Sequence, residues 1–592
     1  MNYPVWYLPQ TGGGLLIALI AVLHVFVSHF AVGGGLYLIY SERKGLKENS
    51  RAILDFTAKH ARFFLLITMV FGSITGVGIW FIIALVNPAA TSLLIHNFVF
   101  GWAAEWVFFV VEIAAAFVYY YMFGRMDPAT HQLVGWLYFI AAWLSLFLIN
   151  GIIGVMLTPG EWAVNMNFWV GFFNPSFWPS LFFRTFLAIL IAACYGYFSA
   201  AFYQDEDVST EMTAFSAKWG LASLVLAIPS GLWYLSVLPE PAYALVAGKS
   251  PTIAMVLPWG VAGALVLAFV MLGTGVARPK KNLRPAALLA LVSALAVMGS
   301  FEWIREAARR PYVINSVMFS NGIMADEAEN INRDGFLRSA LFVENNELTR
   351  DNVLRVGEEL YINQCYACHT RDGGSNDIAG LTEKMSFRAL NSYIGRIHEV
   401  RYFMPPFVGT KMEQEALAAY ITGGIHGRDF ELSRETDSGK AQQTGPVLFE
   451  ENCSSCHEHA DLKAAMEGLG QGEIETLLGS LDEISDEMVP FGGSEAQRRL
   501  LAGFLAQPGD GGEQAPPGAG DDTGRMLFEN NCMICHQQEE LMSAVEGQGG
   551  EELVRMLKTL DEISDEMQPF SGTDKEQRAL ANYLESLNQG GQ

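Results

Sequence analysis

Hydrophobic residues along the chain change their pattern once, near residue 310. Before that point, apolar runs alternate with short polar connections. Each run has about 20 residues, the length at which a helix crosses the roughly 30 Å hydrocarbon core of a bilayer. The runs lie near residues 13–40, 62–87, 98–123, 131–157, 180–203, 218–239, 253–277 and 285–304. The pattern predicts an all-α fold that begins with an eight-span transmembrane helical bundle in the lipid bilayer.

The charges of the connecting loops predict the orientation of these spans. The loops "SERKGLKENSR" and "ARPKKNLRP", after the first and seventh runs, are basic, whereas the loops after the second, fourth and sixth runs carry almost no charge. Basic loops face the cytoplasm. The acidic loop "YQDEDVSTEM" after the fifth run departs from this pattern. The first run is too long for a signal-peptide core and has no small-residue cleavage site, so we interpret it as a span. Both termini are then expected on the periplasmic side of a bacterial inner membrane.

The net charge of −24 lies almost entirely after residue 310. Such an acidic half repels nucleic acid and anionic lipid and favours a neutral or basic partner. We therefore exclude nucleic-acid binding. We also expect a periplasmic redox protein as a partner, because this half carries the haem motifs described next.

Six of the seven cysteines fall into three CxxCH motifs, "CYACH", "CSSCH" and "CMICH". In this motif two thiols attach a haem covalently and the adjacent histidine binds its iron. Disulfide bonds would not require a histidine after each second cysteine. We expect three covalently bound haem c groups, held by Cys365, Cys368 and His369, by Cys453, Cys456 and His457, and by Cys532, Cys535 and His536. Their attachment outside the cytoplasm agrees with the orientation of the spans.

A methionine lies at a similar distance after each motif and is the expected second iron ligand. These methionines are Met404 in "RYFMPPF", Met488 in "ISDEMVPF" and Met567 in "ISDEMQPF". The proline that closely follows each one favours a loop over a helix. The alternative ligands are Met412, Met466, Met542, His398 and His459.

The second and third motifs belong to an internal repeat. The segments "LFEENCSSCH…LDEISDEMVPFGG" and "LFENNCMICH…LDEISDEMQPFSG" align with a period of 79 residues, which indicates tandem duplication. The first motif has the layout of a class I cytochrome c domain. The expected organisation is a transmembrane domain (1–312), a connector (313–348), three small α-helical cytochrome c domains (349–428, 440–507 and 524–588) and a flexible linker (508–523).

Ionisable residues within the spans are candidates for function because a bilayer disfavours them. The first run carries His24 and His29, and the third carries Glu105 and Glu112. Seven residues make nearly two helical turns, so both carboxylates are expected on one face. A histidine facing them would suit a haem or proton site. We interpret His60, His96 and His131 as interfacial.

The first half resembles subunit I of the cytochrome bd quinol oxidases. The resemblance rests on "LHVFVSHFAVGGGLYLIYSERKG", "FGSITGVGIWF", the two glutamates, "NPSFWPSLFFRT" and "REAARRPYVI", in that order over roughly residues 10 to 315. It implies that His24 and Glu105 bind two haems of b or d type at which oxygen is reduced. It also implies that Glu112 supports this site and its protons, and that a similar second membrane subunit is a partner.

Three departures from that family concern quinol oxidation. Arg184 occupies the position of a histidine that binds the low-spin b haem, and the partner methionine position falls near Ala264. The long loop that helps to bind quinol is also missing. An arginine has no free lone pair for iron, so we expect no low-spin b haem at Arg184. Its side chain is expected to reach the nearby membrane surface.

Three functions remain open from the sequence. The first is a bd-like terminal oxidase, or a reductase of a related gas, in which the cytochrome c domains are the electron entry. The second is a non-catalytic electron-transfer subunit that anchors three c haems to a larger respiratory complex. The third keeps quinol oxidation at a relocated site near Arg184 or Lys249.

Overall fold

The computed structural model describes residues 4–281, 284–432, 444–485, 488–506, 528, 549–560, 570 and 574–589. Two compact units divide the chain, Met1–Ala506 and Gln507–Gln592. The bundle and the first two motifs belong to the first unit. The remaining predicted haem residues, Cys532, Cys535, His536 and Met567, lie outside the described residues.

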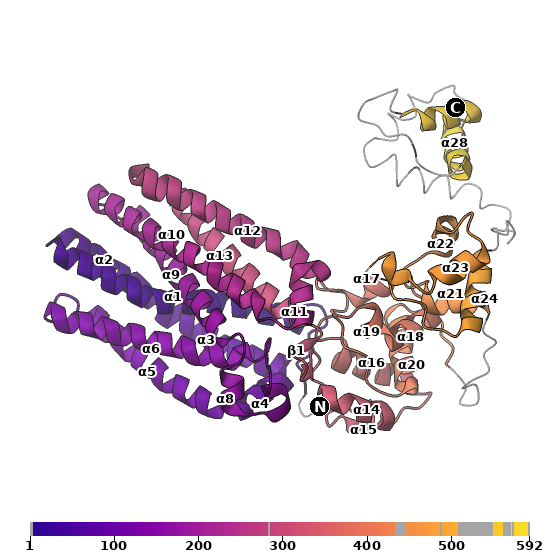
Figure 1. Cartoon of the computed structure of the whole chain (residues 1–592), viewed down its shortest axis with the longest axis horizontal. Coiled ribbons are helices and arrows are strands. Elements are labelled where there is room, and N and C mark those ends of the chain that lie inside the picture. The colour runs from indigo at the N-terminus through magenta and orange to yellow at the C-terminus, as the bar shows by residue number, and fades with distance from the viewer. Residues whose placement is uncertain are drawn as a thin grey trace. The chain divides into compact units, whose positions relative to one another are not determined.

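The described residues contain eight helices that are long and apolar enough to cross a membrane, which confirms the predicted number (Figure 1). Two of them contain π-helical turns, η1 (Leu66–Gly72) between α2 and α3, and η3 (Met271–Ala277) after α12. The spans are α1 (Gly13–Lys47), α2 to α3 (Arg51–Leu65 and Ser73–Val86), α5 (Val99–Tyr121), α6 (Pro128–Gly154), α9 (Phe177–Ala201), α10 (Glu206–Ser236), α12 (Pro251–Val270) and α13 (Arg284–Ala307).

Side chains just before several spans fix where they begin. The Ser50 hydroxyl accepts a hydrogen bond from the Ile53 amide at 3.3 Å and starts α2. The carboxylates of Asp127 and Asp205 do the same for α6 and α10. Such caps satisfy amides that have no partner within the helix. Short helices occupy the other connections: α4 (Pro88–Asn97), α7 (Trp162–Asn165), α8 (Phe168–Phe172) and α11 (Glu240–Ala244), which continues into η2 (Leu245–Lys249).

Helix α1 lies at the centre of the bundle because it packs against α2, α3, α6, α9 and α13. Glycine makes this close packing possible. A Cβ atom on Gly33 would lie 2.0 Å from the Ala188 carbonyl oxygen of α9. Small residues at such crossings allow helix backbones to approach within a membrane. The packed core includes Phe30, Tyr37 and Leu187.

The predicted connector packs partly on the membrane bundle and partly on the first haem domain. It forms a two-stranded antiparallel hairpin, β1 (Tyr312–Ile314) and β2 (Met318–Phe319), with Tyr312 opposite Phe319, so the fold is mostly rather than wholly helical. It continues through η5 (Ala325–Glu327), α14 (Ala328–Asp334) and α15 (Phe336–Ser339). Its buried side chains from Phe319 onward share one core with Val356, Leu360 and Leu417, whereas those of residues 313–318 pack with the bundle. The domain itself consists of α16 (Val353–Gln364), α17 (Ile378–Thr382), α18 (Phe387–Gly395), α19 (Ile397–Val400), α20 (Lys411–Ala419) and η6 (Tyr420–Ile425).

The internal repeat of the sequence is visible in the fold. The Phe491 amide donates to the Leu478 carbonyl at 2.8 Å, and 79 residues later Phe570 donates to Leu557 at 2.8 Å. Core residues repeat with the same period, since Leu501 corresponds to Leu580. The second domain consists of α21 (Gly445–Asn452), α22 (His459–Ala465), α23 (Gln471–Leu477), η7 (Leu481–Glu483) and α24 (Glu495–Ala506). In the second unit α27 (Gly550–Lys558) and α28 (Asp574–Gln589) correspond to α23 and α24.

Candidate functional site

The first CxxCH motif forms one tight turn at the end of α16. The amides of Cys368 and His369 both donate to the Cys365 carbonyl, at 3.1 and 3.0 Å. Both thiols are free. The His369 Nδ1 atom lies 2.8 Å from the Asn376 carbonyl and donates to it, which leaves Nε2 available. A carbonyl that holds one ring nitrogen in this way orients a histidine for binding a metal through the other.

The protonation of this motif also suits haem attachment. Removal from solvent lowers the pKa of His369, although the bond to Asn376 opposes that shift. A neutral imidazole is the form that binds iron. Burial raises the pKa of Cys365 to about 12, so its side chain is a thiol at neutral pH. The residues present therefore fit a covalently attached haem with His369 as an iron ligand.

The loop that carries Met404 is tied to the same motif. The Gln364 side chain donates to the Val408 carbonyl at 2.8 Å and accepts from the Val408 amide at 2.9 Å. Gln364 immediately precedes Cys365, so these bonds fix the loop against the end of α16. The Met404 carbonyl accepts a hydrogen bond from His398 Nδ1 at 2.6 Å. The alternative Met412 is 52% exposed at the start of α20.

The second motif repeats this turn. The amides of Cys456 and His457 donate to the Cys453 carbonyl at 3.1 and 2.9 Å. Met488 lies in a loop, as its following proline predicts. The alternatives have other surroundings: Met466 is buried in the domain core, and the His459 ring stacks on Phe504 with 4.6 Å between centroids.

Polar contacts join the second domain to residues that flank α18 of the first. The Ser386 hydroxyl donates to the Glu450 carboxylate at 2.6 Å. Lys384 forms an ion pair with Glu458 at 3.0 Å, next to the second motif. The Arg396 guanidinium donates to the Glu451 carbonyl at 3.1 Å, two residues before Cys453. The second attachment motif thus lies beside the first domain.

The first motif also contacts the residues that follow the last span. The Arg310 guanidinium lies 2.6 Å from the Cys368 sulfur. On the other side of this turn, the Tyr366 hydroxyl accepts from the Leu8 amide at 2.8 Å and donates to the Trp6 carbonyl at 3.0 Å. Both chain segments that border the bundle therefore hold this motif.

The two glutamates of α5 share one face, as predicted, and both face α6. Glu105 accepts from the Ser145 hydroxyl at 2.7 Å, and Glu112 accepts from the Tyr138 hydroxyl at 3.1 Å. His24 has a different neighbour, because its Nδ1 lies 3.2 Å from the Thr75 hydroxyl of α3. In the described part of the chain, no three or more His, Cys, Asp or Glu residues gather where they could hold a metal ion.

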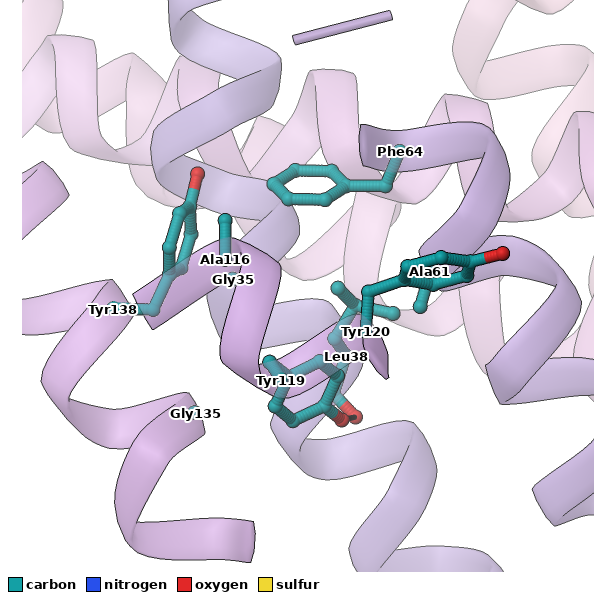
Figure 2. A pocket seen from close by; sticks show the side chains of 9 residues that line it. All are labelled: Gly35, Leu38, Ala61, Phe64, Ala116, Tyr119, Tyr120, Gly135 and Tyr138. Atoms are coloured by element: carbon teal, nitrogen blue, oxygen red, sulfur yellow. Dashed lines mark hydrogen bonds between the residues drawn. The ribbon is translucent and has the colours of Figure 1, made fainter. Parts of the chain in front are cut away.

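A small cavity lies between α1, α2, α5 and α6. Figure 2 shows aromatic rings around it, among them Phe64, Tyr119 and Tyr138. Tyr138 joins the cavity to Glu112 through its hydroxyl. Tyr119 donates at 2.9 Å to a second buried carboxylate, Glu42.

Arg184 is buried, which corrects the expectation that its side chain reaches the membrane surface. Only 3% of the residue is exposed. Its guanidinium lies 2.9 Å from the Glu302 carboxylate of α13 and packs over the Phe301 ring. Arg305 pairs with the same carboxylate at 2.9 Å. A buried cation is tolerated when it is paired in this way.

Sequence reasoning missed several buried polar groups. The partner of Arg184 could have been suspected from the sequence, because Glu302 is an acidic residue within an apolar run. His131 is buried rather than interfacial and contacts Glu42 at 2.7 Å. His60 is buried as well, beside the Ser199 hydroxyl. The Nε2 atoms of His29 and His60 are buried and have no hydrogen-bond partner among the described residues.

Comparison with known protein families identifies the haem-bearing part of the chain. A family described as "Cytochrome C oxidase, cbb3-type, subunit III" matches residues 352–421 and 519–584. The chain carries cytochrome c domains. The matched residues contain the first and third CxxCH motifs. The second motif lies outside them, and its assignment rests on the shared turn and on the repeat.

Other comparisons add less. No curated protein matches the chain. Among solved structures, the bd oxidase from Geobacillus thermodenitrificans is similar with a TM-score of 0.45 and 16% identity, over 52% of this chain and 89% of that one. The eight spans and the cytochrome c domains together describe a multi-pass membrane protein of respiratory electron transfer with covalently bound haem c.

Proposed function

We propose that the chain passes electrons between three periplasmic c haems and a haem site in its membrane half, where oxygen or a related gas is reduced. The observation that carries this proposal is the contact between Arg310 and Cys368. It joins the first haem attachment motif to the end of α13, so the first c haem adjoins the bundle. A haem domain that served only soluble partners would not require this contact.

The c haems would form a series within the periplasmic half. His369, His457 and His536 would bind the three irons, with Met404, Met488 and Met567 as second ligands. A bound c haem supplies reversible one-electron oxidation and reduction. The contacts of Lys384, Ser386 and Arg396 with the second domain hold that domain's motif beside the first. Electrons would then move between the second and first haems before they enter or leave the bundle.

The membrane residues would have separate roles. His24 and Glu105 would bind haem, and Glu112 would hold or move a proton at its carboxylate. Support for the proton role is the Tyr138 hydroxyl, which links Glu112 to the cavity between α1, α2, α5 and α6. Arg184 would bind no haem, because its guanidinium is occupied by Glu302. We also propose a second, bd-like membrane subunit as partner and a periplasmic redox protein as electron donor or acceptor.

The test uses the purified full chain with any subunits that copurify. Pyridine haemochrome spectra should give non-covalent haem of b or d type in addition to c haem. Rapid mixing of the reduced protein with oxygen, and separately with nitric oxide, should then oxidise the c haems. Glu112→Gln should slow this oxidation, whereas Glu48→Gln, an exposed change at the cytoplasmic end of α1, should not. Only c haem, with no oxidation by either gas, would contradict the proposal.

The second candidate is a non-catalytic electron-transfer subunit. The neighbours of His24 and Glu105 favour it, because His24 contacts Thr75 and Glu105 contacts Ser145. In that case the bundle would anchor the c haems to a larger respiratory complex. The same haem analysis separates the two functions, because an anchor would contain c haem alone and would transfer electrons only to added partner subunits.

A further inference from the structure

We propose that the outer end of the membrane bundle sets the axial ligation and the reduction potential of the first c haem. Two residues would do this: Phe403, next to the expected iron ligand Met404, and Arg310, beside the attachment sulfur of Cys368. The inference rests on the proposed function in one respect, namely that the first CxxCH motif and Met404 hold a c haem. It holds whichever way electrons flow and whether or not the bundle contains haem.

Phe403 holds the methionine loop against the bundle. Its half-buried ring packs on an apolar cluster that includes Tyr234 of α10, Leu245 of η2 and Ala307 of α13. The preceding residue, Tyr402, donates its hydroxyl hydrogen to the Lys249 carbonyl. Two successive side chains before Met404 are therefore fixed by the membrane half.

The haem domain fixes the same loop from the other side. His398 Nδ1 donates to the Met404 carbonyl, and Gln364 holds Val408 by two hydrogen bonds. Met404 thus lies between a bundle contact at residue 403 and a domain contact at residue 408. A methionine sulfur stays on iron only while its loop keeps this position, so Phe403 is a positioning residue for that ligand.

Arg310 places a positive charge at the attachment edge. Its guanidinium lies 2.6 Å from the Cys368 sulfur, which bonds to the porphyrin once haem is attached. Reduction adds one negative charge to the haem, and a nearby cation stabilises the reduced form. The carboxylate of Glu306, 3.6 Å from Arg310, offsets part of this charge and helps to hold the side chain in place.

The test uses the full chain with all of its haems. Phe403→Ala should weaken the near-infrared methionine-to-iron charge-transfer band by the contribution of one haem and should lower one midpoint potential in a redox titration. Phe387→Ala is the matched control, because that half-buried ring packs in the same domain against Phe430. It should leave the band and all potentials unchanged. Phe403→Leu, which keeps an apolar group at the bundle, should retain most of the band.

Arg310→Gln is the independent arm. It should raise the oxidised-to-reduced ratio of one haem about tenfold at a fixed potential. This corresponds to a midpoint potential that is lower by about 59 mV for one electron. Arg310→Lys should restore most of the potential, and Arg338→Gln, at an exposed cation of α15, should have no effect. The proposal is overturned if Phe403→Ala and Phe387→Ala change the spectrum equally, or if Arg310→Gln leaves every potential unchanged. Neither readout depends on oxygen reduction, so failure of the proposed function would appear separately.

Discussion

Arg184 shows what a buried cation requires inside a membrane bundle. Its guanidinium is buried and pairs with Glu302, which also pairs with Arg305. One carboxylate therefore serves two cations. Such a group is more sensitive to loss of the acid than to loss of either base, because two positive charges then remain buried without a partner.

We therefore expect Glu302→Gln to destabilise the bundle strongly. Loss of one partner from a buried ion pair costs about 3–5 kcal/mol. Thermal unfolding of the purified chain in detergent, followed by loss of helical circular dichroism, measures the effect. Glu48→Gln is the control, since its ion pair with Lys44 is partly exposed at the end of α1 and such pairs contribute about 0–1 kcal/mol. Equal unfolding temperatures for the two variants would contradict this interpretation.

The sequence reveals such residues but not their partners. Arg184 and Glu302 can each be recognised as a charge within an apolar run, yet 118 positions separate them and no local pattern connects them. The same holds for Glu42 and His131. For Glu105 and Glu112, the spacing along one helix was sufficient to predict that both carboxylates lie on the same face.

At the level of elements, Gly33 determines how closely α1 and α9 approach. Gly33→Ala would place a methyl group against the Ala188 carbonyl, which is backbone and cannot rotate away. We expect the helices to separate at a cost of about 1–3 kcal/mol. The yield of folded protein after detergent extraction and its unfolding temperature should both fall. Gly273→Ala, where a new Cβ would meet no atom within 4 Å, should change neither.

Glu413 joins the connector to the first haem domain. Its carboxylate accepts hydrogen bonds from the amides of Phe336, Leu337 and Thr410, at 3.0, 2.8 and 2.7 Å. It thereby satisfies the first turns of both α15 and α20, while the residue itself is 4% exposed. One side chain thus starts two helices that come from different parts of the chain.

Glu413→Ala should leave these amides buried without an acceptor. We expect a loss of about 3 kcal/mol, because each unsatisfied group costs about 1–3 kcal/mol. Thermal unfolding followed by c-haem absorbance should show one transition at lower temperature. Glu383→Ala removes an exposed glutamate from the same domain and is the control. An unchanged transition in Glu413→Ala would show that the connector is not held in this way.

Elements with a local signal were predictable, whereas the connector was not. The eight spans follow from run length, and the two described motif turns follow from the spacing of cysteines and histidine. The connector has no periodic pattern, and its helix α15 depends on Glu413, which lies far along the chain. Its role in the haem domain therefore became visible only in the structure.

On the scale of the whole molecule, charge and chemistry divide the chain in the same place. The bundle is nearly neutral and contains buried ion pairs such as Glu42–His131 and Arg184–Glu302, whereas the acidic half carries the haem motifs. The first haem domain packs on the bundle through Arg310, Phe403 and the N-terminal segment. The duplicated domains add two further haem motifs to the chain. Each has a hydrophobic core made of its own residues.

This division predicts that the C-terminal half lies outside the cytoplasm. Eight spans together with the basic loop at Arg43 and Lys44 predict that the end of α1 faces the cytoplasm and that both termini lie on the opposite side. An epitope tag fused after Gln592 should bind antibody in intact spheroplasts. A tag inserted at Asn49, in the turn between α1 and α2, should bind only after lysis. Covalent c-haem staining of the same samples shows that the fused domain has matured. A C-terminal tag that requires lysis would contradict the orientation, and with it the electron route from periplasmic haems into the bundle.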